Sequence, residues 1–211
     1  MTFEWSPLSN RATTTATTME SPMIAALLSL ALQAAPLPQP SGAPTFRGEG
    51  QMRMFDMICG RIFPDDARVA AGMASISGAR PLTPEELRTY LKDDPGRGWV
   101  MPAGTSRIVV TIEAPPIHSC TVRITNTDGA IDEGKWQQLL TAAQARSGGG
   151  FVTLPPQTFE TGGIRSQVGG VQKQGPGGAA EAIYLIRSSP KQPGFATEIR
   201  MVRQLVTPQR R

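Results

Sequence analysis

The chain has 211 residues, a formal net charge of +4 and a hydrophobic content of 39%, values that fit one globular domain with flanking segments and exclude a wholly disordered chain. The charge is uneven, because from residue 187 onward one acidic residue accompanies the basic residues Arg187, Lys191, Arg200, Arg203, Arg210 and Arg211. No aromatic platform or nucleic-acid-binding motif accompanies these residues, so nothing favours nucleic acid as a partner.

Residues 1–34 are typical of a secretory signal peptide. Ile24 to Leu32 is an unbroken run of apolar and small residues, shorter than the roughly 20 residues that a membrane-spanning helix needs. Ala34 then offers a small residue at a cleavage point. Residues 1–22 carry acidic side chains that a signal peptide does not need, which is explained if translation begins at Met19 or Met23. The competing interpretation is a short buried helix in a cytoplasmic protein.

Residues 35–48 form a Pro-rich segment, which we expect to be a mobile leader at the start of the mature chain. No cysteine closely follows the apolar run, so the pattern does not indicate a lipid-anchored protein, and no transmembrane anchor is expected after cleavage. The sequence therefore predicts a periplasmic or secreted protein with a single domain over residues 49–207 and a basic tail over residues 208–211.

Three helices are predicted in the first half of the domain. The spacing of Met52, Phe55, Cys59 and Ile62 places them on one face of a helix over residues 49–63. A second helix spans residues 64–75, with Asp65 and Asp66 near its positive end. The third is the segment "TPEELRTYL", in which Thr83 caps the helix and Pro84 takes its first position.

The apolar pattern then changes to a period of two, which is typical of strands. Two strands are predicted in "RIVVTIE" and "CTVRITN", followed by a helix over residues 132–146. Residues 151–174 are Gly-rich and predict one strand, a long turn and poorly ordered backbone. "EAIYLIR" reads as a central strand, and "FATEIRMVRQLV" alternates Ile199, Met201 and Leu205 with Arg200 and Gln204. The predicted fold is α+β, with the N-terminal helices and one later helix packed on one face of an antiparallel sheet of about five strands.

The two cysteines, Cys59 and Cys120, both lie on apolar faces of elements far apart in the sequence. In an oxidising compartment two such residues are expected to form a disulfide bond. Two alternatives stay open, namely two free buried thiols or a reactive thiol. His118 is the single histidine and lies two residues from Cys120, so on a strand the two side chains share a face and make a candidate Cys–His pair.

Other chemical motifs are weak. One histidine and adjacent carboxylates such as Asp65-Asp66 and Asp93-Asp94 do not make a metal site, and the Gly-rich stretches lack the context of a phosphate-binding loop. No cofactor is therefore predicted. The segment "DPGRGWVMP" places Arg97 and Trp99 in a Gly-containing loop, where the two side chains make a candidate binding patch. The alternative is that Trp99 packs into the core and the glycines only turn the chain.

The region Gly50 to Asn126 loosely resembles small exported proteins of unknown function from Gram-negative bacteria. The resemblance rests on "FDMICGRIFPD", "LTPEELRTYL", "DPGRGW" and "APPIHSC", and it implies no activity.

Three functions follow as hypotheses. The first is an exported, non-catalytic domain that binds another envelope component or a small ligand, with Arg97, Trp99 and His118 as candidate binding residues. The second is a hydrolase that uses His118 as a base. The third is a structural protein that touches anionic surfaces through its basic C-terminal end, including Arg200, Arg203 and residues 208–211.

Overall fold

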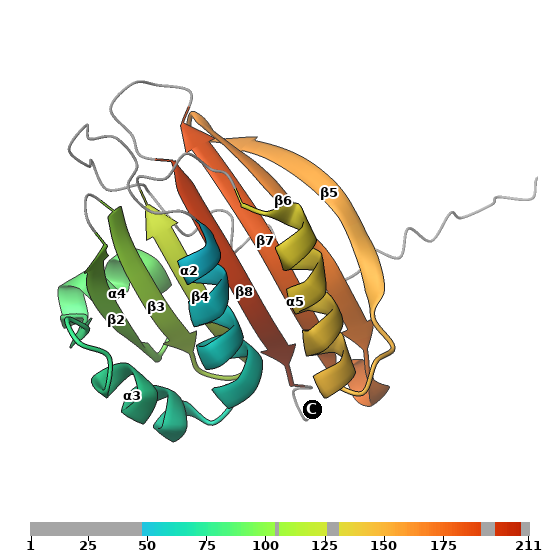
Figure 1. The fold of residues 1–211 in the computed structure, drawn as a ribbon, viewed down its shortest axis with the longest axis horizontal. Coiled ribbons are helices and arrows are strands. Elements are labelled where there is room, and N and C mark those ends of the chain that lie inside the picture. Colours follow the sequence, from blue (N-terminus) through green and yellow to red (C-terminus); the bar gives the residue numbers. More distant parts are fainter. Residues whose placement is uncertain (1–47, 104–105, 126–130, 191–196, 208–211) are drawn as a thin grey trace, which may run out of the picture.

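A computed structural model describes residues 48–103, 106–125, 131–190 and 197–207. The predicted signal peptide, most of the leader and the basic tail lie outside these residues. The described part is a mixed α and β structure built on one antiparallel sheet (Figure 1). Among the described residues no helix combines the length and the apolar character needed to cross a membrane.

The sheet has eight strands in the spatial order β1-β2-β3-β4-β8-β7-β6-β5, with every neighbouring pair antiparallel. The strands are β1 (Arg80–Pro81), β2 (Gly96–Ala103), β3 (Ser106–Glu113), β4 (Ile117–Thr125), β5 (Val152–Thr161), β6 (Ile164–Gln174), β7 (Ala180–Pro190) and β8 (Glu198–Val206). The α+β class and the antiparallel sheet are confirmed, and the prediction of about five strands is wrong.

Three strands were not predicted: β1, β2 and one of the two strands in the Gly-rich region. Residues 152–174 form the long hairpin of β5 and β6, which turns at Gly162 and Gly163, both with positive φ. Glycine suits these two positions because it adopts positive φ without steric cost. The glycines that suggested poorly ordered backbone therefore serve a tight turn between two regular strands.

The helices are α2 (Gly48–Phe55), the π-helix η1 (Asp56–Ile62), α3 (Asp66–Ala74), α4 (Pro84–Leu91) and α5 (Glu133–Arg146), with a short 3-10 turn η2 (Pro176–Gly178) before β7. We call the face of the sheet that carries α2 and α5 the front face (Figure 1). η1 and α3 belong to the same layer, because Ile58, Val69 and Met73 join one buried cluster with the front-facing residues Val122 and Met201 of the sheet.

Helix α4 lies on the opposite face of the sheet, which we call the back face. This corrects the prediction that all helices share one face. Tyr90 and Leu82 pack there with Val100 and Val109, which point away from the front cluster. A Cβ atom on Gly96 would lie 2.4 Å from Leu91 Cδ1 and 2.3 Å from the Ile112 carbonyl oxygen. The glycine of β2 thus allows α4 to approach the backbone of the sheet.

The predicted helix starts are confirmed by their caps. The Asp65 side chain accepts a hydrogen bond from the Arg68 amide at 3.0 Å. Thr83 and Glu86 form a reciprocal capping box, with Pro84 at the first helical position. At the start of α5, the Asp132 side chain accepts a hydrogen bond from the Lys135 amide, without a reciprocal bond. These side chains satisfy amide groups that have no partner inside a helix, which explains why the helices begin where they do.

The last two strands occupy the middle of the sheet. β7 lies between β6 and β8, and β8 lies between β7 and β4, so the central position predicted for "EAIYLIR" is confirmed. Both faces of these strands are buried, including Ile186, Arg200 and Gln204 on the back face. The basic residues Arg200 and Arg203 therefore lie in a central strand and not on a solvated edge of the sheet. At the end of the sheet, β5 is irregular between Leu154 and Gln157, where Pro155 and Pro156 interrupt its pairing with β6.

Candidate functional site

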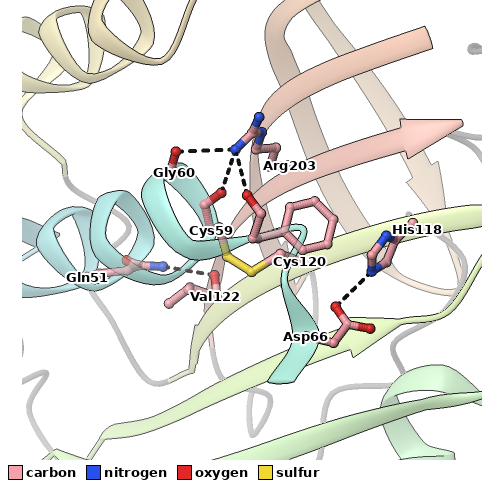
Figure 2. The surroundings of a disulfide bond; sticks show 9 residues. Gln51, Cys59, Gly60, Asp66, His118, Cys120, Val122 and Arg203 are labelled. Carbon is pink, nitrogen blue, oxygen red and sulfur yellow. Dashed lines mark hydrogen bonds and ion pairs between the residues drawn. A yellow bond between two sulfur atoms is a disulfide. The ribbon is translucent and has the colours of Figure 1, made fainter. Parts of the chain in front are cut away.

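The opening helical segment is joined covalently to the sheet. Cys59 of η1 and Cys120 of β4 form a disulfide bond with a Cα–Cα distance of 5.5 Å, and both residues are fully buried (Figure 2). The predicted disulfide is confirmed, and the alternatives of two free thiols and a reactive thiol are wrong. A fully buried bridge closing a long loop is the arrangement of a structural disulfide.

Arg203 of β8 fixes the same helical segment by hydrogen bonds. Its Nη1 lies 3.1 Å from the Cys59 carbonyl oxygen, 3.2 Å from that of Gly60 and 3.1 Å from that of Phe63 (Figure 2). Its Nε donates to Glu181 Oε1 at 2.9 Å. The last carbonyl groups of a helix have no partner within it, and a guanidinium group there also suits the negative end of the helix dipole. Arg203 is therefore a cap for η1.

Sequence reasoning missed this role, although the signal was present. Arg203 has the same strand phase as the apolar residues Ile199, Met201 and Leu205, a phase that is typical of the side of a strand facing a core. A charged residue in an inward phase needs a buried partner. The prediction treated Arg203 as part of a basic end and did not ask where its partner lay.

His118 lies beside the disulfide and contacts the start of α3. Its Nε2 is 2.9 Å from Asp66 Oδ1, and its ring meets the Phe63 ring edge-on at 4.5 Å between centroids (Figure 2). The His118 side chain is 13% exposed. Among the described residues no hydroxyl or thiol hydrogen-bonds His118, and Cys120 is bonded to Cys59. The candidate Cys–His pair is therefore wrong, and His118 ties β4 to α3.

Arg97 and Trp99 do not form a loop patch. Both belong to β2, and Trp99 is 7% exposed within the front cluster. Arg97 is exposed. The alternative that Trp99 packs into the core is confirmed. The assignment of the glycines to a turn is wrong, because Gly96 and Gly98 are strand positions on which α4 packs.

A groove runs between α2 and α5 on the outside of the front layer, with a volume of about 460 Å³. Met52 and Leu139 lie along it, and an ion pair between Glu49 and Lys135 joins its two sides. The hydrogen bond from Lys135 lowers the pKa of Glu49. The groove has apolar and charged lining from both helices, which is a mixture common to binding surfaces.

Arg187 and Arg200, the other described basic residues from position 187 onward, are also paired. Arg187 forms an ion pair with Glu133, and Arg200 Nε lies 2.8 Å from Glu198 Oε1. Burial lowers the pKa of Arg200 to about 10. Lys191, Arg210 and Arg211 lie outside the described residues. Arg200 and Arg203 therefore do not present their charges to solvent.

The described residues contain no group of three or more His, Cys, Asp or Glu side chains that could hold a metal ion. Comparison with protein-family models, with curated proteins and with solved structures found no match to this chain. What can be inferred about function therefore rests on the geometry given above.

Proposed function

We propose that this chain is an exported, non-catalytic binding domain that takes another envelope component or a small ligand. The proposal rests on the structural role of the two cysteines and the single histidine. Both cysteines join η1 to β4, and the single histidine joins β4 to the start of α3. The disulfide leaves neither cysteine free to act as a nucleophile, and the histidine is largely buried against Phe63 and Asp66.

Export is supported by the disulfide and by the apolar run near the start of the chain. Disulfides of this kind persist in the periplasm and outside the cell and are rare in the cytoplasm. The bridge joins residues 61 positions apart, so its loss is expected to destabilise the fold substantially. This dependence favours a compartment in which the bridge is maintained.

The groove between α2 and α5 supports binding. It lies on a layer that the disulfide and Arg203 hold in place, so its shape is fixed before a partner arrives. Preformed surfaces bind more tightly because less conformational entropy is lost on association. The groove is therefore the front-face surface on which we expect an envelope component to dock.

Export is tested by expressing the full chain in a Gram-negative host, fractionating the cells and trapping free thiols before and after reduction. We expect a periplasmic or secreted product cleaved near Ala35, whose two cysteines react with the trapping agent only after reduction. An uncleaved cytoplasmic product with two reactive thiols would contradict the proposal.

The absence of catalysis is tested by incubating the purified protein with a broad panel of ester, peptide and glycoside substrates. We expect to detect no turnover that is present in the parent protein and lost in a His118→Gln variant. Turnover lost in that variant, with an unchanged melting temperature, would favour the hydrolase hypothesis. The partly buried groove residue Leu139 offers the docking test: Leu139→Glu should reduce co-purification of envelope proteins, while the exposed Met57→Glu change on the same layer serves as the control.

A further inference from the structure

A second hollow lies on the back face, at the end of the sheet formed by β1, β2 and β3. Its volume is about 590 Å³, and its lining includes Ala79, Arg80, Val100, Pro102 and Arg107. Two guanidinium groups therefore share the hollow with small aliphatic side chains. Pockets of this size that combine apolar walls with a few fixed polar groups are typical of small-ligand sites.

The carboxylate of Glu86 forms hydrogen bonds with both arginines. Arg80 Nη1 and Nη2 each lie 2.8 Å from an oxygen of Glu86, and Arg107 Nη2 lies 3.0 Å from Glu86 Oε1. These hydrogen bonds, with Arg80 as the main cause, lower the pKa of Glu86 to about 2. Glu86 is itself fixed by its capping bond to the Thr83 amide. The guanidinium groups are therefore positioned without any ligand.

Both arginines keep donors for a further partner. A guanidinium group has five N–H donors, of which Arg80 uses three, to Glu86 and the Pro81 carbonyl oxygen, and Arg107 uses one. Their side chains are 55% and 26% exposed. Two positive charges face one negative charge, so the cluster retains a net positive charge at the hollow. A guanidinium fork matches the geometry of carboxylate and phosphate oxygens.

We propose that this hollow binds a small organic anion, with its carboxylate or phosphate head on Arg80 and Arg107 and a small apolar body against Val100 and Pro102. The inference rests on the proposed function, and it specifies the small ligand as an anion. It does not depend on the groove between α2 and α5, which lies on the other face. The two surfaces can therefore be tested separately.

The test is a calorimetric titration of the full-length chain as processed by a Gram-negative host. The ligands are benzoate, phenyl phosphate, inorganic phosphate and uncharged benzyl alcohol. We expect saturable binding of benzoate, phenyl phosphate or both, and their relative affinities distinguish a carboxylate ligand from a phosphate ester. Benzyl alcohol should bind at least about tenfold more weakly, because it lacks the charge-assisted hydrogen bonds.

Arg107→Gln should weaken the binding of the preferred anion at least about tenfold. Arg61→Gln is the matched control, because it removes one positive charge from another exposed arginine that pairs with a carboxylate, and it should change the affinity less than about twofold. If Arg107→Gln fails to fold, Arg80→Gln replaces it, since Arg80 is more exposed.

Three results would overturn the anion site: no saturable binding of either aromatic anion, equal losses in Arg107→Gln and Arg61→Gln, or inorganic phosphate binding as tightly as phenyl phosphate. In the last case the apolar wall contributes nothing. None of these results bears on export or on the absence of turnover, so the proposed function would still stand.

Discussion

The two faces of the sheet hold their helices by different means. On the front face, η1 is bonded covalently through Cys59 and Cys120, and Arg203 donates hydrogen bonds to its backbone carbonyl groups. On the back face, α4 packs against the glycines of β2 and is joined to neighbouring strands by ion pairs of Glu86. Both faces use ion pairs, but the front attachment adds a covalent bond that the back attachment lacks. Reduction should therefore loosen the front face before the back face.

The largest effect is expected from removing the disulfide. The closed loop spans 61 residues, so the chain-entropy model predicts a loss of about 4 kcal/mol of unfolding free energy in a Cys59→Ala, Cys120→Ala variant. Urea unfolding measures this loss. Hydrogen exchange should show faster exchange in α2 and η1 than in α4. Equal acceleration in α4 would show that the two attachments are not independent.

The next effect is expected from Arg203→Met, which keeps an unbranched apolar stem but removes the guanidinium group and its charge. Glu181 then loses its closest cation and three backbone carbonyl groups of η1 lose their donor. Removing one member of a buried ion pair costs about 3–5 kcal/mol, and the partial exposure of Arg203 places our expectation near the lower figure. A second variant, Glu181→Gln with Arg203→Met, should recover part of the loss. If it recovers none, the carbonyl contacts carry the whole effect.

A smaller effect is expected from Gly96→Ala on the back face. The new Cβ atom would lie 2.3 Å from the Ile112 carbonyl oxygen, and overpacking of this kind costs about 1–3 kcal/mol. Gly72→Ala on α3 is the matched control, because its nearest contacts are at 3.6 Å and alanine favours a helix by up to about 1 kcal/mol over glycine. The two substitutions should shift the melting temperature in opposite directions.

The smallest effect is expected from Glu86→Gln. The pKa of Glu86 falls from 4.5 to about 2 on folding, so its stabilising contribution is full above about pH 4.5 and is lost as the pH falls towards 2. The variant should be less stable than the parent by about 1 kcal/mol near neutral pH, and the difference should vanish near pH 2. Urea unfolding across this range tests the sign. A difference that grows in acid would contradict the role of Glu86.

Local signals in the sequence predicted helix starts on both faces and one contact across the front core. The caps at Asp65 and Thr83 mark helix starts because their side chains satisfy amide groups close in sequence. The inward phase of Cys59 and Cys120 predicted their contact across the core. These inferences needed only neighbouring residues, or one shared apolar face.

The features that sequence reasoning missed depend on contacts between distant elements. The pattern of α4 shows an apolar stripe but not which face of the sheet receives it, and that choice is made by the glycines of β2. Arg80 and Arg107 come from separate strands that the sheet register brings to one hollow, and Glu86 reaches both from α4. The hairpin of β5 and β6 was missed because its glycines resemble those of irregular backbone.

The irregularity in β5 bears on how the protein behaves at high local concentration. β5 ends the sheet, and strands in that position are templates for pairing with another copy. Pro155 and Pro156 have no amide hydrogen, and the ladder to β6 shifts where they stand. A neighbouring molecule that tried to extend the sheet would meet a gap in donors near the middle of the strand. The two prolines thus protect the chain against fibre-like self-association.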